Sequence, residues 1–356
     1  MKKKHICFVT KFYGVPKNGP STFANNFVKE LVNSKEYTIT VISGEDVESK
    51  FGENVLAYKS SKHIADGLKI RKLIKELSKT TTIDFIYFNC FRNAIFSYDL
   101  NIPFYLNIND HHSFIKRKSF IWKLLSSPVF KNSTKSFVNS KFTYNNISVS
   151  DRVRKEKFLV TGKAINLEEF QFNYNQIQKS VNILYVGSEF QRKGLDIALH
   201  SIKIFKEKTS FDIRFDVVGE SVNQLSVYKK IVEDFDITEN VNFLGRKSKE
   251  EIMKLHEDAH FFILPSREEA FGVSLLEALA SGTTVVASNT GGIPSIITDG
   301  LNGLLVEVGD YKELASKLIY LTNNDTTREN ITNEGLKRSK EYDFKNLYKE
   351  ITSFLP

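Results

Sequence analysis

The sequence predicts an α/β fold built from two Rossmann-like domains. Its 356 residues suit two domains better than one. Apolar, β-branched runs alternate with segments of helical period along the chain, which is typical of parallel α/β architecture. The polar stretch Lys163–Gln178, rich in Asn and Gln, separates these runs into two series. Two series joined by one linker predict two domains of similar design.

Each series contains six predicted strands, each followed by a polar turn or a helical segment. The first series is His5–Thr10, Tyr37–Ile42, Phe85–Asn89, Phe104–Ile108, Ser136–Val138 and Phe158–Val160. The second series is Val181–Val186, Arg214–Val218, Val241–Phe243, His260–Leu264, Thr284–Ala287 and Gly303–Val306. The tail Glu341–Leu355 has helical spacing with aromatic residues and predicts a last helix. We therefore expect an N-terminal domain over residues 1–165 and a C-terminal domain over residues 178–340.

Composition excludes several classes of protein. No apolar run approaches the length of a membrane span, and the basic start of the chain is followed by too short an apolar run for a signal peptide. Cys7 and Cys90 both lie in apolar runs, so we expect thiols in a reducing compartment, not joined in a disulfide. No Cys/His spacing predicts a zinc site. These features favour a cytoplasmic protein.

The net charge of +8 is distributed unevenly. Residues 1–165 hold 28 Lys and Arg against 13 Asp and Glu, whereas the remaining residues hold 22 against 29. Such asymmetry indicates different partners for the two halves. The stretch 111–150 has seven basic residues and no acidic one. Its aromatic-aliphatic part suits either an anionic membrane surface or a core-packed helix with a solvated lysine face. The residues assigned to this membrane or acceptor surface are Lys116, Arg117, Lys118, Trp122 and Lys123. No nucleic-acid motif accompanies the charge.

The most informative segment is Ser266–Asp310. It carries Glu269 in a polar loop, turns through Phe271-Gly272 into an apolar helix, and places Glu277 inside that helix. A helix start supplies N–H groups and a positive dipole end for phosphate. Flanking carboxylates accept hydrogen bonds from hydroxyls. The combination predicts a site for a ligand with a polyol and a phosphate, as in a sugar nucleotide.

Four motifs, which follow one another along the chain in the family's order, resemble one known family, the retaining glycosyltransferases of family 4, which have the GT-B fold. Glu269–Glu277 resembles the family's E-x7-E signature. Ile183–Asp196 is similar to its strand, loop and helix for the donor diphosphate, and Asn242–Gly245 to the turn before the nucleotide base. Ala287–Gly303 is similar to its closing unit. The resemblance implies two facing Rossmann-like domains with a C-terminal helix, 341–356, that crosses back to the first.

The resemblance also implies roles for the residues of the E-x7-E segment. Glu269 would bind the hydroxyls of the donor sugar, and Glu277 would bind the ribose. The backbone N–H groups that would hold the β-phosphate or sugar are those of Phe271, Gly272 and Val273. A surface position is the alternative for Glu277, but its neighbours are apolar, and a buried acid needs a partner.

Arg192 and Lys193 follow the strand Val181–Val186 and precede Gly194. Two adjacent cations at a helix start suit a diphosphate leaving group, although an ordinary basic helix cap is the alternative. The arrangement resembles the branch of lipopolysaccharide-core glucosyltransferases. Many family members have an arginine at the place of Ser188. In the first strand–helix loop, where the family has a glycine pair under the diphosphate, this chain has Gly19 followed by a proline, which lacks an amide donor.

Candidate catalytic groups follow the strand Phe104–Ile108. The family has a histidine or aspartate facing the reaction centre at this place, so the resemblance assigns Asp110 first and His111 second, with a structural role for the histidine left open. Adjacent His111 and His112 do not form a metal pair, because neighbouring side chains of an extended chain point apart. Asp234-Phe235-Asp236 is not a metal-binding D-x-D motif, because it ends an amphipathic helix and does not follow a strand.

The predicted function is retaining transfer of a hexose, from UDP-glucose or UDP-galactose, to a cell-surface polysaccharide or lipid-linked glycan. The resemblance implies a reaction without metal or cofactor, with the nucleotide sugar as co-substrate. The alternatives are a catalytically silent nucleotide-sugar-binding subunit and a GT-B nucleotide-sugar epimerase; no signature of a pyridoxal-phosphate phosphorylase is present. We expect a cytoplasmic protein that is peripheral on the inner face of the membrane if the basic stretch binds lipid.

Overall fold

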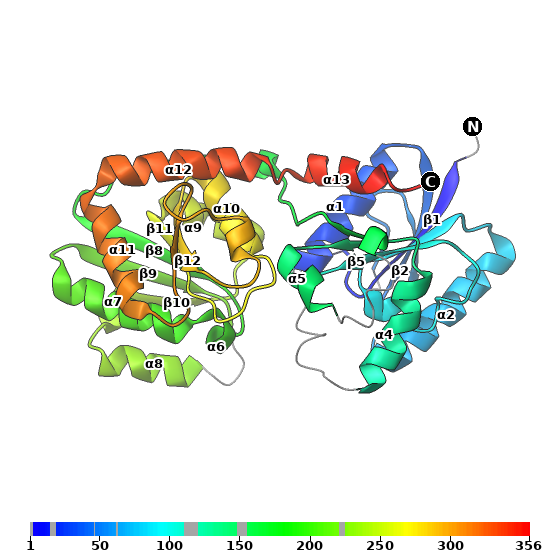
Figure 1. Ribbon diagram of the computed structural model, residues 1–356, viewed down its shortest axis with the longest axis horizontal. Coiled ribbons are helices and arrows are strands. Elements are labelled where there is room, and N and C mark those ends of the chain that lie inside the picture. The colour runs from blue at the N-terminus through cyan, green and yellow to red at the C-terminus, as the bar shows by residue number, and fades with distance from the viewer. Residues whose placement is uncertain are drawn as a thin grey trace. The chain divides into compact units, whose positions relative to one another are not determined.

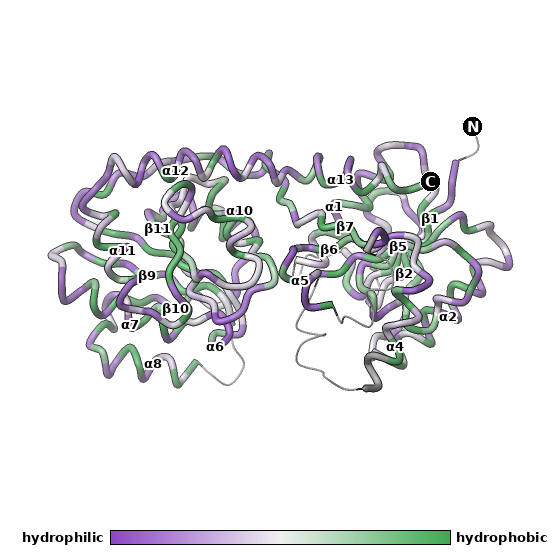
Figure 2. The backbone as a smooth tube through the Cα atoms, in the orientation of Figure 1, coloured by the Kyte–Doolittle hydropathy of each residue, from purple (hydrophilic) through white to green (hydrophobic). Residues whose placement is uncertain are grey.

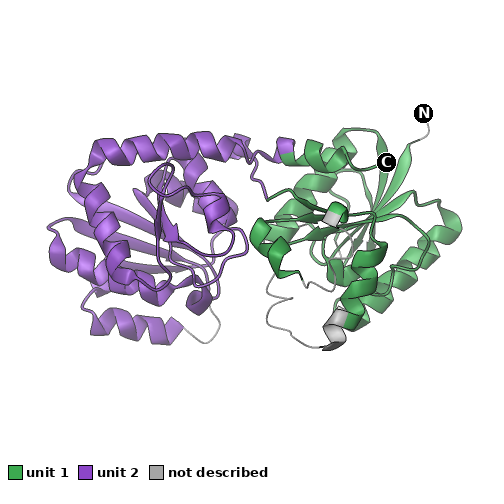
Figure 3. Ribbon diagram, viewed as in Figure 1, with its two compact units in different colours: residues 1–162, 347–356 green, residues 163–346 purple. Residues whose placement is uncertain are grey.

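The protein consists of two compact units, each built around a parallel sheet (Figures 1 and 3). The computed structural model describes residues 3–14, 19–45, 47–61, 63–109, 120–147, 155–220 and 225–356. Unit 1 comprises Met1–Gly162 and Leu347–Pro356, and unit 2 comprises Lys163–Asn346. The predicted α/β fold with two Rossmann-like sheets is confirmed. The polar stretch that was predicted as the linker lies within unit 2.

In unit 1 the described residues form a seven-stranded parallel sheet with strand order β3-β2-β1-β4-β5-β6-β7. The strands are β1 (Lys4–Thr10), β2 (Tyr37–Ser43), β3 (Asn54–Ala57), β4 (Phe85–Phe88), β5 (Phe104–Ile108), β6 (Lys135–Val138) and β7 (Phe158–Val160). The helices are α1 (Gly19–Asn33), α2 (His63–Thr80), η1 (Phe91–Ala94), α4 (Phe120–Asn132), α5 (Lys141–Asn146) and η3 (Lys155–Lys157). The strand order doubles back at β1, which is the topology of a doubly wound sheet.

In unit 2 the described residues form a six-stranded parallel sheet with strand order β10-β9-β8-β11-β12-β13. The strands are β8 (Ser180–Val186), β9 (Asp212–Val218), β10 (Val241–Gly245), β11 (Phe261–Leu264), β12 (Thr284–Ser288) and β13 (Leu304–Val306). The helices are η4 (Leu167–Glu169), α6 (Phe190–Lys193), α7 (Leu195–Lys208), α8 (Leu225–Asp234), η5 (Thr238–Asn240), α9 (Lys249–Asp258), α10 (Val273–Ser281), η6 (Ile293–Ser295), α11 (Tyr311–Asn323) and α12 (Asp325–Lys340). The last helix, α13 (Phe344–Thr352), begins in unit 2 and ends in unit 1. All twelve predicted strands occur within two residues of their predicted bounds.

The sheet of unit 2 is buried on both faces, because successive residues of a strand point to opposite sides. Ile183 and Tyr185 of β8 belong to one core, which also contains Leu199 of α7. Leu184, between them, belongs to a second core, which contains Leu276 of α10. Figure 2 shows the strands as apolar segments enclosed by helices of mixed polarity. This two-faced burial explains why the strands read as nearly continuous apolar runs in the sequence.

The last helix, α13, returns the chain to unit 1. Tyr348 donates a hydrogen bond to the Glu30 carbonyl oxygen (3.3 Å), and its ring meets Phe27 edge to face. Phe354 lies against Phe137. Aromatic contacts of this kind add about 0.5–1.5 kcal/mol each to the burial of their area. The C-terminal helix predicted from the tail therefore forms and belongs, from residue 347 on, to unit 1.

The backbone enters and leaves unit 2 side by side. Ile165 and Asp343 form an isolated parallel bridge. The amide of Ile165 donates to the Tyr342 carbonyl oxygen (3.1 Å), and the amide of Phe344 donates to the Ile165 carbonyl oxygen (2.8 Å). The segment that enters unit 2 and the segment that leaves it are thus hydrogen-bonded to each other through their main chains.

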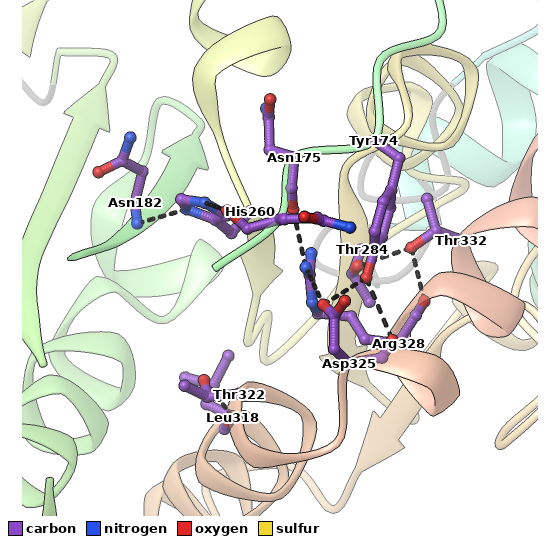
Figure 4. A network of polar contacts seen from close by, with 11 residues as sticks. Tyr174, Asn175, Asn182, His260, Thr284, Leu318, Thr322, Asp325, Arg328 and Thr332 are labelled. Carbon is purple, nitrogen blue, oxygen red and sulfur yellow. Dashed lines mark hydrogen bonds and ion pairs between the residues drawn. The ribbon is translucent and has the colours of Figure 1, made fainter. Parts of the chain in front are cut away.

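A buried arginine fixes the polar stretch after the bridge (Figure 4). Arg328 of α12 is 1% exposed. It donates to the carbonyl oxygen of Asn175 (2.7 Å) and to Asp325 Oδ1 (2.6 Å), and its guanidinium lies 4.4 Å from the centre of the Tyr174 ring. Tyr174 in turn donates to Asp325 Oδ1 (2.7 Å). The Arg328 cation is paired with Asp325 and stacked on the Tyr174 ring. The stretch around Tyr174 is therefore part of the folded unit and not a flexible connection.

Among the described residues, no helix combines the length and the apolar character that crossing a bilayer requires. Asp234 is the last residue of α8, and Asp236 follows in a turn with φ of 54°. Within the described ranges, no group of three or more His, Cys, Asp or Glu side chains is placed to hold a metal ion.

Acid is expected to destabilise the protein through His256 of α9. The ring is fully buried, and burial lowers the pKa of His256 to about 3. Between pH 6.5 and 3, His256 therefore binds a proton in the unfolded chain but not in the folded protein. The free energy of unfolding should fall as the pH drops through this window, by about 1.4 kcal/mol per pH unit.

Urea unfolding at a series of pH values measures this effect. His256→Gln should flatten the acid slope, whereas His200→Gln, at a half-buried position, serves as the control. An equally steep slope in His256→Gln would show that other groups cause the acid sensitivity.

Candidate functional site

The candidate site lies at the carboxyl edge of the unit 2 sheet. Three neighbouring strands, β8, β11 and β12, each end in a loop there: residues 187–189, 265–272 and 289–292. Because the strands are parallel, these loops meet at one edge, where α/β sheets bind ligands. Each loop carries residues that the sequence singled out.

Glu269 lies between the two predicted cations. Its Oε2 atom is 3.3 Å from Lys193 Nζ and 3.8 Å from Arg192 Nη1. Arg192 is also held by Glu189 Oε2, which accepts from its Nε (3.0 Å), and by the carbonyl oxygen of Glu268, which accepts from Nη1 (2.8 Å). The two loops after β8 and β11 are therefore joined through one carboxylate and two cations.

Glu269 is an ionised carboxylate in this environment. Burial alone would raise the pKa of Glu269, but Lys193 and Arg192 outweigh it, and the pKa lies below its ordinary value. The residue is only 8% exposed. No donor in the described part of the chain reaches Oε2 with hydrogen-bond geometry. The carboxylate thus keeps hydrogen-bonding capacity for a hydroxyl group.

The paired glycines after β12 fix the backbone of Glu269. The amide of Gly292 donates to the Glu269 carbonyl oxygen (2.9 Å). A Cβ atom on Gly291, whose φ is 59°, would collide with the same oxygen, and one on Gly292 would collide with the carbonyl oxygen of Ala270. The sequence showed this glycine pair, and the structure shows that its function is close backbone contact with the acidic loop.

Arg192 and Lys193 end the one-turn helix α6, whereas the sequence predicted them at a helix start. Gly194, with φ of 73°, separates them from α7. The difference arises because the left-handed glycine breaks one helical segment into two. The side chain of Lys193 passes over Gly187, and a Cβ atom on Gly187 would collide with it. Both cations therefore still lie at the carboxyl end of β8.

The helix α10 begins at Val273, with Gly272 as its N-cap residue. Gly272 has φ of 99°, and no side chain caps the helix. A backbone in this conformation favours glycine. Phe271 is buried, and its ring meets Tyr342 edge to face. In the first turn the amide of Leu275 donates to the Gly272 carbonyl oxygen (3.0 Å). Within the described residues no such bond occupies the amides of Val273 and Ser274, which are open to a ligand or solvent.

Glu277 is the fifth residue of α10, just over one turn from its start, and is half-buried. Burial raises the pKa of Glu277, Lys249 and Lys193 oppose this increase, and Glu169 adds to it. Lys249 and Glu169 form an ion pair with each other. Within the described ranges, no side chain forms a hydrogen bond or ion pair with Glu277, so its carboxyl group keeps hydrogen-bonding capacity.

The predicted residues of unit 1 are less completely described. Gly19 is the first residue of α1 and is exposed. Trp122 and Lys123 fall in α4. The residues that lie outside the described ranges are Asp110, His111, Lys116, Arg117 and Lys118.

A group of asparagines at the carboxyl edge of the unit 1 sheet escaped the sequence analysis. Asn89 donates to the carbonyl oxygen of Pro20 (2.8 Å) and accepts from Asn107 (3.2 Å). Asn109 donates to the Asn89 carbonyl oxygen (2.9 Å), and Asn139 donates to that of Asn109 (2.8 Å). The sequence does contain a pattern that could have predicted this group, since an asparagine lies at or just after the end of three neighbouring strands. These bonds position the start of α1 and the residue that precedes Asp110.

Tyr185→Phe is expected to stabilise the protein. The Tyr185 side chain is fully buried, and no described residue bonds its hydroxyl. Removing an unsatisfied buried group should raise the free energy of unfolding by about 1 kcal/mol. Urea unfolding checks this against Tyr174→Phe, which removes a hydroxyl bonded to Asp325 and should lower stability. A loss of stability in Tyr185→Phe would mean that its hydroxyl has a partner.

Comparisons of this chain with known proteins identify similar sequences and folds. Residues 167–338 match the family model described as Glycosyl transferases group 1. An uncharacterised glycosyltransferase of Methanocaldococcus jannaschii is 28% identical over 335 residues, which cover 91% of this chain and 90% of that one. The capsular polysaccharide biosynthesis glycosyltransferase CapM of Staphylococcus aureus is 26% identical over 233 residues, 62% of this chain and 60% of that one.

Solved structures show the same fold. Anabaena HepE in complex with UDP-glucose has a TM-score of 0.81 at 16% identity and matches over 99% of both chains. WaaG, a glycosyltransferase involved in lipopolysaccharide biosynthesis, has a TM-score of 0.78 at 15% identity, over 98% of this chain and 99% of that one. The fold is therefore GT-B. The chain is a glycosyltransferase, and its residues 167–338 match group 1, the family that the E-x7-E segment resembles.

Proposed function

We propose that this glycosyltransferase transfers a hexose, with retention, from a UDP-sugar bound in unit 2, with UDP-glucose or UDP-galactose as donor. The observation that carries the proposal is Glu269 beside Lys193 and Arg192. The cations suit a diphosphate, and the carboxylate suits the hydroxyls of the attached sugar. Glu277, farther along the same edge, suits the ribose. The UDP-glucose complex of HepE supports UDP as the nucleotide.

In the proposed mechanism the protein acts by positioning and by stabilising charge. Arg192 and Lys193 neutralise the negative charge that grows on the leaving diphosphate, so no metal is required. Retention without a protein nucleophile fits a front-face reaction in which the β-phosphate takes the proton of the acceptor. Asp110 and His111 are the proposed residues of unit 1 near the reaction centre, by their resemblance to the family's pattern.

We propose a cell-surface polysaccharide or a lipid-linked glycan as the acceptor, bound by unit 1. The excess of basic residues in residues 1–165 suits an acidic or membrane-tethered molecule. Exposed apolar side chains on the same unit, Ile64 and Leu68 of α2 and Leu124 of α4, support a peripheral position on an anionic membrane. Relatives such as CapM, named for capsular polysaccharide biosynthesis, support this acceptor class.

A thermal-shift screen tests the donor class. The full chain is mixed with UDP-, GDP-, ADP- and CMP-sugars, with Glu277→Ala as the control variant. UDP-sugars should raise the melting temperature of the wild type, because a ligand that binds only the folded protein stabilises it. The shift should be reduced in Glu277→Ala. If no nucleotide sugar causes a shift, the proposed donor site fails.

A further inference from the structure

We propose that Glu269 competes with the donor diphosphate for Lys193 and Arg192, so that the site prefers a nucleoside diphosphate carrying a sugar to one without. This inference rests on the proposed function, and it adds how the same site distinguishes the donor from the product of the reaction.

The first step is that Lys193 is held less firmly by the protein than Arg192 is. Within the described residues, Glu269 is the one acidic side chain at ion-pair distance from Lys193 Nζ. Arg192 has two further partners, Glu189 and the carbonyl oxygen of Glu268, which keep it in place. Lys193 has a flexible chain and three donors that rotate freely. A diphosphate at this edge of the sheet therefore draws Lys193 away from Glu269 more easily than it draws Arg192.

The second step is that Glu269 cannot follow the cation. Its backbone is fixed by the amide of Gly292 and by close contact with Gly291. The amide of Ala270 also donates to its Oε1 atom (3.1 Å). The carboxylate is buried, and a buried charge that loses its partner is destabilised. A nucleoside diphosphate alone therefore leaves Glu269 in an unfavourable state.

The third step is that a sugar supplies the missing partner. Apart from its ion pairs with Lys193 and Arg192, Oε2 of Glu269 has no polar partner in the described part of the chain. The hydroxyls of a sugar attached to the β-phosphate can donate to it. Diphosphate and sugar thus help each other to bind. After transfer, the remaining nucleoside diphosphate again competes with Glu269 for Lys193, and this competition favours release of the product.

The test compares UDP with UDP-glucose by titration calorimetry on the full chain. The wild type should bind UDP-glucose more tightly than UDP. Glu269→Gln should bind UDP about five- to tenfold more tightly than the wild type does. The reason is that the side chain at position 269 no longer carries the negative charge that competes with the phosphate for Lys193. The same variant should lose the preference for UDP-glucose. UDP affinity that is unchanged or weaker in Glu269→Gln overturns the inference.

Two further variants separate competition from general electrostatics. Glu268→Gln removes the same formal charge one residue away and should leave the affinity for UDP close to that of the wild type. An equal gain in both variants would overturn the competition model. In a Lys193→Ala background, Glu269→Gln should give a smaller gain, because the contested cation is gone. If the wild type binds neither UDP nor UDP-glucose, the proposed donor class fails as well; if it binds both equally, only the competition fails.

Discussion

Replacing Arg192 and Lys193 together by alanine is expected to weaken the binding of UDP-glucose by at least about 3 kcal/mol, or more than a hundredfold, because each charge-assisted hydrogen bond contributes roughly 1.5–3 kcal/mol. Both side chains are largely buried beside Glu269, so solvent screens them little. The double variant also leaves Glu269 without its counter-charges, which disfavours an approaching phosphate further. Titration calorimetry of the purified variant with UDP-glucose measures the loss.

The matched control is a pair of cations in the same unit that are away from the site. Lys203 and Lys206 lie on α7, and their replacement by alanine removes the same formal charge. This control should bind UDP-glucose almost as the wild type does. If the affinity of the Arg192/Lys193 variant is also unchanged, the diphosphate does not bind at the end of β8, and the assigned site is wrong.

Gly291→Ala is expected to cause the second large effect, on both stability and turnover. A left-handed backbone costs a residue with a Cβ atom about 1–2 kcal/mol, and the collision with the Glu269 carbonyl oxygen adds overpacking of similar size. We expect a total loss of about 3 kcal/mol in the free energy of unfolding. Because the acidic loop must shift, turnover should fall by about a hundredfold.

Gly300 provides the control for this prediction. It also has a positive φ, 76°, but a Cβ atom there would meet no atom within 4 Å. Gly300→Ala should therefore show only the backbone cost and keep its activity. Urea unfolding and donor turnover of the two variants, measured side by side, isolate the contact with Glu269. Equal behaviour of the two variants would show that the glycine pair does not position the acidic loop.

The fold was largely predictable because buried parallel strands are predominantly apolar. The one strand that the sequence analysis missed, β3, is an edge strand of four residues, all at least partly exposed. Its apolar run, residues 55–57, is only three residues long, and its pairing with β2 depends on contacts distant in sequence. The one-turn helix α6 was also missed, because a helix of four residues has no period to detect.

The site was predictable in its residue types but not in its contacts. Glu269, Glu277, Arg192 and Lys193 were identified from motifs whose order resembles a family. The pairing of Glu269 with Lys193 joins residues 76 positions apart in the chain, and no local pattern shows which cation meets which acid. The contact of Gly291 with the acidic loop and the bonds of Asn89 likewise arise only when parallel strands place distant loops at one edge.

The bridge between Ile165 and Asp343 has a consequence for the engineering of this enzyme. Unit 2 begins and ends at two main-chain segments that are hydrogen-bonded to each other, so topologically it is an insertion into the rest of the polypeptide. Such an insertion can be exchanged as a cassette, because both splice points occupy one small patch of backbone. With the donor site that we propose in unit 2, chimaeras joined at these two positions should transfer the nucleotide specificity of one relative to another without redesign of the remaining chain.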